Sequence, residues 1–282
     1  MEMKDNIRQV TDISAPELAV FNQSSERQLA HYFEPHGGIF IAETGEVISL
    51  ALQAGMEPLA ALAANGKAGQ MRRLLERWPH IPVWTAEESV LTNITGYRLT
   101  RGMLCAMRRP APADPRQIIK NARSLAILEN VMNPTNVGAI IRSAAALGVE
   151  GILLTKGCSD PLYRRAIRVS TGNVFKIPWA WVGEDTPLSW PQGTLAMLKE
   201  AGFTTAAMTP GENSLPLDDP RLTAGSKVAV LLGTEGEGLQ QQTIMACDYA
   251  VRIPMSAGVD SLNVAAASAV TFWQLCRKKR NM

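Results

Sequence analysis

The sequence of 282 residues predicts an α/β fold, in which a smaller N-terminal α/β domain precedes a domain built on a parallel sheet with helices on both faces. Short continuous apolar runs alternate with helical patterns through the second half, which is typical of parallel strands that helices cover on both faces. The prolines Pro110, Pro112 and Pro115 disfavour both a helix and a central strand. We therefore expect domains at 1–109 and 121–282, joined by a linker at 110–120.

The N-terminal domain carries signals of small alternating units, which fit an α/β domain of about a hundred residues. The elements expected there are helices at Glu26–Ala30 and Ala68–Arg77 and strands at Gly38–Glu43 and Pro82–Thr85.

In the C-terminal domain one helix has clear boundaries. Asn133 suits the cap, Pro134 suits the first turn and Gly148 ends the helix. We also expect strands at Ser124–Leu128, Gly151–Thr155, Phe203–Met208, Val228–Leu232 and Tyr249–Ile253, and helices at Thr194–Ala201 and Leu262–Trp273. Parallel sheets bind ligands beyond the carboxyl ends of their strands, so the loops at those ends are the candidate sites.

Composition excludes several classes of protein. The four cysteines lie far apart with no C-x-x-C pair, which argues against a zinc ribbon or a disulfide framework and suits a reducing cytosol. The first residues lack the apolar stretch of a signal peptide, and no apolar run approaches the roughly 20 residues of a membrane span. We expect a cytoplasmic protein without a metal site or a membrane partner.

Positive charge is concentrated between Arg98 and Arg123, where seven basic residues occur against one acid, Asp114, although the net charge of the chain is only +2. Such a strip can face phosphates or simply be a solvated linker, and both interpretations stay open. All three histidines lie in the first third of the chain. Chemistry in the C-terminal domain would therefore have no histidine base of its own.

Three loops at strand ends could carry that chemistry. The helix that opens at Asn133 places Gly138 and Arg142 four positions apart on one face, which is either a ligand-facing arginine or an exposed one over a tight packing contact. The loop Gly233–Gly238 has three glycines and two glutamates and no Gly-Lys-Ser/Thr sequence, so it suits ribose or a sulfonium better than a pyrophosphate. The third loop follows Ile253-Pro254-Met255, and the helix start after it has free N–H groups beside Ser261 and Asn263.

Together and in this order, the three loops resemble the signature motifs of the SpoU (TrmH) branch of SPOUT RNA methyltransferases. The matching stretches are Asn136-x-Gly138-Ala139-x-x-Arg142, Leu232-Gly233-x-Glu235-x-x-Gly238, and Ile253-Pro254-Met255 with Ser261-Leu262-Asn263-Val264. The resemblance covers about 124–275. The N-terminal part is similar, more loosely, to an L30e-like RNA substrate-binding domain at Gly38–Glu43 and at 94–103. The sequence departs from the family pattern at Asp260 and at Ala265-Ala266.

This resemblance implies a deep trefoil knot, an obligate homodimer with its active site at the subunit interface, and S-adenosyl-L-methionine as cofactor. It implies 2′-O-methylation of a ribose, which we expect in ribosomal rather than transfer RNA. The residues implied as catalytic are Arg142, Asn136, Glu235, Ser261 and Asn263. Those implied to bind the cofactor are Leu232, Gly233, Thr234, Glu235, Gly238, Ile253, Pro254, Met255, Ser261, Leu262 and Asn263.

Arg142 would act either as the base for the ribose hydroxyl or as a charged clamp, because a guanidinium rarely loses its proton. RNA would bind through the Arg98–Arg123 strip, Arg101 included, and through Arg164, Arg165 and Arg168. The alternative is a non-catalytic RNA-binding or ribosome-assembly factor that kept the fold. A third hypothesis, a nucleotide enzyme that binds phosphate at Gly233–Gly238, lacks the lysine it would need.

Overall fold

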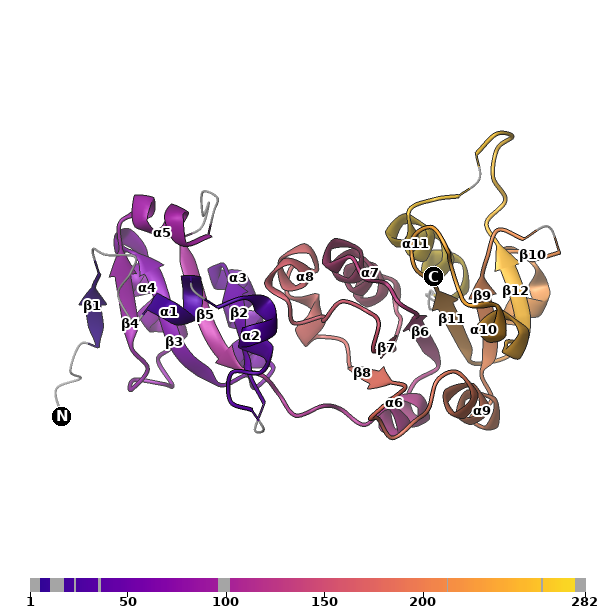
Figure 1. Cartoon of the computed structure of the whole chain (residues 1–282), viewed down its shortest axis with the longest axis horizontal. Helices are drawn as coiled ribbons and strands as arrows, with labels where there is room; N and C mark the ends of the chain where they lie inside the picture. The colour runs from indigo at the N-terminus through magenta and orange to yellow at the C-terminus, as the bar shows by residue number, and fades with distance from the viewer. Residues whose placement is uncertain are drawn as a thin grey trace, which may run out of the picture. The chain divides into compact units, whose positions relative to one another are not determined.

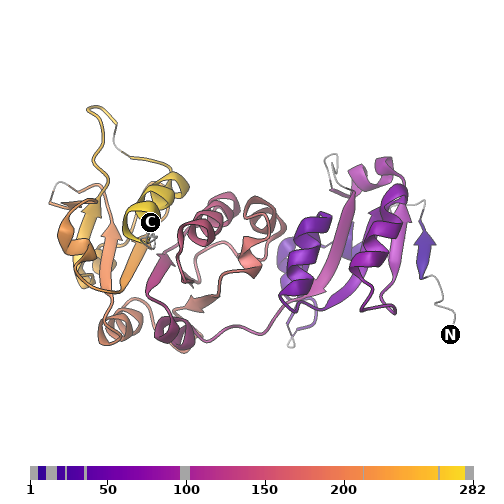
Figure 2. The same ribbon diagram turned by 180° about the vertical axis from the view of Figure 1, so that it is seen from behind.

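The computed structural model of the chain describes residues 6–10, 18–22, 24–34, 37–95, 102–211, 213–259 and 261–276. The chain divides into two compact units, Met1–Ala111 with Leu162–Phe175, and Pro112–Pro161 with Lys176–Met282. Each unit is built on its own sheet; Figure 1 labels the elements, and Figure 2 shows the same colouring from behind. Within the described ranges, no helix is both long and apolar enough to cross a membrane.

The first unit holds a five-stranded mixed sheet in the order β1-β4-β3-β5-β2, in which β5 runs antiparallel to both of its neighbours. Its apolar core includes Ile41, Leu62 and Leu104. The elements, in chain order, are β1 Ile7–Gln9, α1 Ala19–Asn22, α2 Glu26–Ala30, β2 Ile39–Glu43, α3 Gly45–Gln53, β3 Pro58–Ala64, α4 Ala68–Leu74, β4 Val83–Ala86, α5 Glu88–Thr95 and β5 Met103–Arg108.

One helix from the second half of the chain also belongs to the first unit. Helix α8, Arg164–Val169, lies against β2, where the Arg164 backbone N–H donates to Glu26 at 3.0 Å. Its guanidinium forms an ion pair at 3.1 Å with Glu43, a carboxylate that is 3% exposed. The observed units therefore differ from the contiguous domains that we expected from the prolines. The sequence could not show this, because no pattern within α8 indicates which sheet the helix covers.

The expected linker at 110–120 is partly helical, which corrects the sequence prediction. Helix α6, Pro115–Asn121, begins after Asp114, whose carboxylate accepts the Arg116 backbone N–H at 2.9 Å. Proline is favourable at the first helical position, since the missing N–H has no partner there. Ile118 and Ile119 of this helix are buried against the second sheet. The last of the three prolines thus starts a helix.

The second unit holds a seven-stranded sheet in the order β10-β12-β9-β11-β6-β7-β8, and every neighbouring pair is parallel, as the sequence predicts. The strands are β6 Ser124–Leu128, β7 Gly151–Thr155, β8 Trp179–Val182, β9 Thr204–Met208, β10 Leu215–Pro216, β11 Val228–Leu232 and β12 Tyr249–Arg252. The helices besides α6 are α7 Pro134–Leu147, α9 Gln192–Glu200, α10 Gln241–Ala246 and α11 Val264–Leu275.

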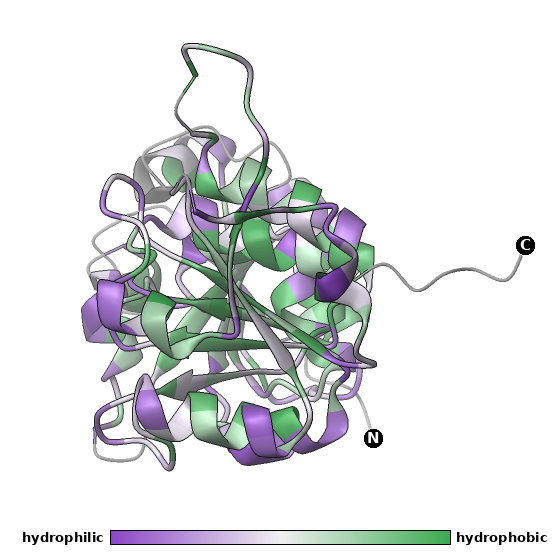
Figure 3. Cartoon of the chain, turned by 90° about the vertical axis from the view of Figure 1, so that its right-hand side faces the viewer, coloured by the Kyte–Doolittle hydropathy of each residue, from purple (hydrophilic) through white to green (hydrophobic). Residues whose placement is uncertain are grey.

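Helices cover both faces of this sheet. On one face Leu125, Ile127 and Leu231 pack against α6 and α9, while α7 and α11 pack against each other above the opposite face (Figure 1). Figure 3 shows the strands in green between helices whose outer sides carry purple, hydrophilic residues. Because helices cover both faces, the sheet is accessible at the end where its strands terminate. The carboxyl ends of β12, β9, β11 and β6 lie side by side there.

Candidate active site

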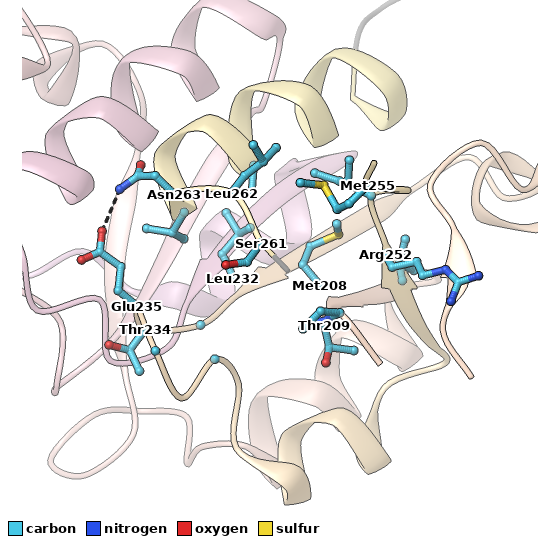
Figure 4. A pocket seen from close by; sticks show the side chains of 18 residues that line it. Met208, Thr209, Leu232, Thr234, Glu235, Arg252, Met255, Ser261, Leu262 and Asn263 are labelled. Atoms are coloured by element: carbon cyan, nitrogen blue, oxygen red, sulfur yellow. Dashed lines mark hydrogen bonds between the residues drawn. The ribbon is translucent and has the colours of Figure 1, made fainter. Parts of the chain in front are cut away.

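A pocket of about 360 Å³ lies at the carboxyl ends of β9, β11 and β12 and at the start of α11 (Figure 4). Every predicted cofactor-binding residue lines it except Pro254, which is exposed. Two of the three motif loops therefore form one cavity. The lining residues are Met208, Thr209, Pro210, Leu232, Gly233, Thr234, Glu235, Gly236, Gly238, Val251, Arg252, Ile253, Met255, Ser261, Leu262, Asn263, Val264 and Ala267.

Sequence reasoning missed the wall formed by Met208, Thr209 and Pro210 at the end of β9. These residues carry no unusual pattern. The signal that could have found them is positional, because β9 was itself predicted as a parallel strand and its carboxyl end meets those of its neighbours.

The glycine-rich loop folds back on itself beside this pocket. The Thr234 N–H donates to the Gly238 carbonyl at 3.2 Å, and the Gly238 N–H donates to the Thr234 carbonyl at 3.1 Å. A Cβ on Gly233 would stand 2.1 Å from the carbonyl carbon of Gly238, and Gly238 has a φ of +73°. Both positions therefore require glycine, one for close backbone approach and one for a left-handed conformation.

Asn136, Glu235 and Asn263, one residue from each motif, meet in a single hydrogen-bond network. The side-chain amides of Asn136 and Asn263 both donate to Oε1 of Glu235, the latter at 2.8 Å (dashed in Figure 4). Asn263 also donates to Oδ1 of Asn136 at 3.4 Å, and its own Oδ1 caps α11 by accepting the Ala265 N–H at 2.9 Å. The first motif is thus joined to the other two at the edge of the pocket.

A second hydrogen-bond network, which is buried and which sequence reasoning also missed, reaches the residues directly after the glycine-rich loop. Glu129, at the end of β6, is 1% exposed. Its Oε1 accepts from the Trp190 indole N–H at 2.6 Å and the Thr243 hydroxyl at 2.7 Å, and its Oε2 accepts the Gln240 backbone N–H at 2.8 Å. This carboxylate connects the end of β6 to Gln240 and α10, directly after the glycine-rich loop.

Arg142 is not brought into the pocket. It is exposed on α7, and in the part of the chain that the structure describes it makes no hydrogen bond or ion pair. Asn136 lies six positions earlier on the same helix, a rise of about 9 Å along the axis. Within one chain, the arginine and the pocket are therefore separate features.

The candidate RNA-binding arginines fall into different settings. Arg164 is engaged in its ion pair with Glu43, Arg165 is exposed and Arg168 is half-buried. Arg108 of the basic strip forms an ion pair with Glu57 at 2.8 Å. Arg101 of the same strip lies outside the described residues, as do Arg98, Asp260 of the third motif and the basic run 277–280.

The cysteines offer no nucleophile to this site. Burial raises the pKa of the Cys158 thiol to about 11, and of Cys105, Cys247 and Cys276 to about 12. Neutral thiols are poor nucleophiles and poor metal ligands. Among the described side chains, no group of three or more His, Cys, Asp or Glu residues could hold a metal ion.

The parallel sheet and its converging strand-end loops have the arrangement expected for the class that the three motifs resemble. Residues 124–273 match the SpoU rRNA methylase family, and the chain belongs to that family. A mycobacterial relative, an uncharacterized tRNA/rRNA methyltransferase of Mycobacterium bovis, is 34% identical over 96% of this chain and 92% of its own length.

Two further proteins are similar. The 23S rRNA (guanosine-2′-O-)-methyltransferase RlmB of Acinetobacter baylyi is 32% identical over 71% of this chain and 79% of its own length. The crystal structure of an AdoMet-bound rRNA methyltransferase from Sinorhizobium meliloti superimposes with a TM-score of 0.78 at 22% identity, covering 96% of this chain and 97% of that one. The similarity to the Sinorhizobium meliloti structure supports the fold of this chain.

Proposed function

We propose that this SpoU-family methyltransferase transfers a methyl group from S-adenosylmethionine to a ribose 2′-hydroxyl of ribosomal RNA, and that it acts as a homodimer. The observation that carries the proposal is the meeting of Asn136, Glu235 and Asn263 beside the pocket. Three motifs far apart in the sequence are joined there, and the same residues are those that the family resemblance assigns to catalysis.

The pocket suits this cofactor in size and chemistry. Its volume of about 360 Å³ lies within the usual range of small-molecule sites, roughly 300–1,000 Å³. Leu232, Ile253 and Leu262 provide apolar walls for a purine face, and Gly233, Gly236 and Gly238 bring the backbone of the glycine-rich loop into the lining, where it can approach an adenosyl group closely. Glu235, the one carboxylate among the described lining residues, is favourable beside a positively charged sulfonium.

When bound, S-adenosylmethionine supplies a methyl group that is already activated, so the protein has to orient the acceptor hydroxyl and favour the loss of its proton. The fixed amides of Asn136 and Asn263 hold the Glu235 carboxylate at the pocket edge, where it can orient that hydroxyl. We assign Arg142 to a charged clamp, because its guanidinium stays protonated and can bind the phosphate beside the ribose and stabilise the developing alkoxide. The hydroxyl proton then leaves to solvent.

An exposed apolar stripe on α11 supports the homodimer. Ala266, Val270 and Trp273 are all exposed, and their spacing of four and three positions places them on one helical face. Such a stripe suits a second copy of the chain better than water. Since α7 packs on α11 and Arg142 of α7 lines neither of the two cavities described for its own chain, we assign Arg142 to the pocket of the partner.

The preference for ribosomal RNA is supported by the additional N-terminal unit and by the similarity to RlmB of Acinetobacter baylyi, a 23S rRNA (guanosine-2′-O-)-methyltransferase. The first unit would grip the RNA through ribose and phosphate contacts. Arg165 and Arg168 of α8 are the described arginines that we assign to this contact. The trefoil knot and the cytoplasmic location stay predictions from the family resemblance and the composition.

The test combines calorimetry with methyl transfer. The wild-type protein should bind S-adenosylmethionine and transfer a labelled methyl group to total RNA from a strain that lacks the enzyme, and the new 2′-O-methyl position is then mapped. Arg142→Ala should abolish transfer and leave cofactor affinity within a few-fold, whereas Lys199→Ala, which removes an exposed cation of α9, should change neither. No heat of binding would favour the non-catalytic RNA-binding alternative, and full activity of Arg142→Ala would refute the assignment of the arginine.

The assignment of Arg142 to the partner's pocket has its own test. Arg142→Ala subunits are mixed with Gly233→Ala subunits, in which we expect the added Cβ to disrupt the cofactor pocket because it would meet Gly238 backbone at 2.1 Å. If each arginine serves the other subunit, the mixed dimer has one intact site and the mixture recovers about a quarter of wild-type activity. No recovery would place arginine and pocket in the same subunit.

A further inference from the structure

A second cavity, of about 320 Å³, adjoins the cofactor pocket. It is lined by Val131, Met132, Asn133, Asn136, Thr234 and Glu235. Thr234 and Glu235 line both cavities. The turn at the start of the glycine-rich loop is therefore the wall between them, and a molecule in the second cavity lies next to one in the first.

The chemistry of the second cavity suits a nucleoside better than a phosphate. Its lining combines the apolar Val131 and Met132 with the amides of Asn133 and Asn136. Among its described lining residues there is no Lys or Arg, and the single charge is the Glu235 carboxylate, which would repel a phosphate. Amides and a carboxylate can hydrogen-bond sugar hydroxyls and base edges, and the apolar groups can lie against a base.

Met132 is the exposed large apolar side chain among the described residues that line this cavity. It is 70% exposed, although the residue before it, Val131, is 1% exposed. The backbone is held on both sides. The Val131 N–H donates to the Cys158 sulfur at 3.3 Å, its carbonyl accepts from Ser159 at 2.9 Å, and Asn133 accepts the Thr135 N–H at 2.9 Å. A large apolar side chain is thus presented at the cavity from a fixed backbone, without contributing to the core.

We propose that the second cavity receives the target nucleotide and that Met132 lies against the face of its base, which makes Met132 a specificity-determining residue. This inference rests on the proposed function. The ribose hydroxyl would then meet the methyl group across the shared wall, at Glu235. Sulfur–aromatic contacts contribute roughly 0.3–1.5 kcal/mol, which corresponds to a factor of about 2–12 in affinity.

The experiment compares two exposed methionines in the full-length enzyme. Met132→Ala is the test variant, and Met245→Ala is the matched control, since Met245 is 76% exposed on α10 and lines neither cavity. Methyl transfer is measured with total RNA from a strain that lacks the enzyme. Met132→Ala should raise KM for RNA about 2- to 12-fold, with thermal stability, dimer mass and S-adenosylmethionine affinity unchanged. Met132→Leu, which keeps an apolar contact, should recover most of the loss.

Each other outcome overturns the inference in a distinguishable way. If the wild-type enzyme transfers no methyl group to RNA, the proposed function fails and the inference fails with it. If the wild-type enzyme is active and Met132→Ala has the same KM as Met245→Ala, the inference alone fails. A Met132→Ala protein with a changed dimer mass would assign the side chain to the subunit interface, and one with weakened cofactor binding would assign it to the first pocket.

Discussion

Replacing Glu129 by glutamine tests whether this buried carboxylate holds the glycine-rich loop in place. Glutamine keeps the shape of the side chain, and its carbonyl oxygen can still accept from Trp190 and Thr243, as Oε1 of Glu129 does at 2.6 and 2.7 Å. The new NH₂ group then faces the Gln240 N–H, which loses its acceptor at 2.8 Å. The substitution therefore removes the hydrogen bond from the Gln240 N–H to the carboxylate and leaves two N–H donors, that of Gln240 and that of the new glutamine, facing each other.

The expected loss follows from that exchange. A hydrogen bond to a charged group contributes about 1.5–3 kcal/mol, so Glu129→Gln should destabilise the second unit by about 2 kcal/mol. At a slope of roughly 2 kcal/mol per molar urea, the unfolding midpoint of that unit should fall by about 1 M. Because Gln240 follows the loop that lines the pocket, cofactor affinity should fall as well.

Urea unfolding followed by tryptophan fluorescence and circular dichroism measures the midpoint, and calorimetry measures cofactor binding. The matched control is Glu237→Gln, the same substitution at an exposed position of the glycine-rich loop, where an effect within about 0.5 kcal/mol is expected. If Glu129→Gln and Glu237→Gln unfold at the same urea concentration, the buried carboxylate does not hold the loop and the argument is wrong.

Two other predictions concern the glycine-rich loop and the thiols. Gly233→Ala should weaken S-adenosylmethionine binding by at least about ten-fold, because its Cβ would meet backbone at 2.1 Å; Gly66→Ala, where a Cβ meets nothing within 4 Å, should bind normally, and equal affinities would contradict the loop geometry. Burial raises the pKa of Cys105 from 9.0 to about 12, so its thiol ionises first in the unfolded chain. That contribution to stability is complete below pH 9 and is lost as pH rises towards 12, and in urea titrations Cys105→Ala should show a shallower alkaline decline than wild type.

The central strands were predictable because their burial leaves a direct mark on the sequence. Ser124–Leu128, Gly151–Thr155 and Val228–Leu232 have the bounds expected from their apolar runs, and all their residues are buried. Strand β3, Pro58–Ala64, was missed although it lies inside the first sheet. It consists mainly of alanine and begins with proline, and neither residue favours strands, so only tertiary pairing identifies it.

The sequence predicts those site residues whose type is uncommon at their position in a strand, loop or helix. Glycines clustered after a buried strand, and asparagines at helix starts, mark the loops in the sequence itself. Glu129 has no such mark, because a glutamate after a strand is commonly a solvated residue, and only its three donors from distant segments reveal its burial. Residues of this kind depend on contacts far apart in sequence, which local patterns do not encode.

Among the described residues, one chain forms the whole pocket proposed for the cofactor, but it does not bring Arg142 to that pocket. The cofactor pocket lies wholly within the second unit, where the Glu129 and Glu235 networks fix its loops. Arg142 and the α11 stripe are exposed on that same unit. Under the proposed homodimer, cofactor binding depends on the fold of one subunit, whereas methyl transfer also needs Arg142 of the second subunit and the bound RNA. We therefore expect a single subunit to bind S-adenosylmethionine, and methyl transfer to require the dimer with RNA bound.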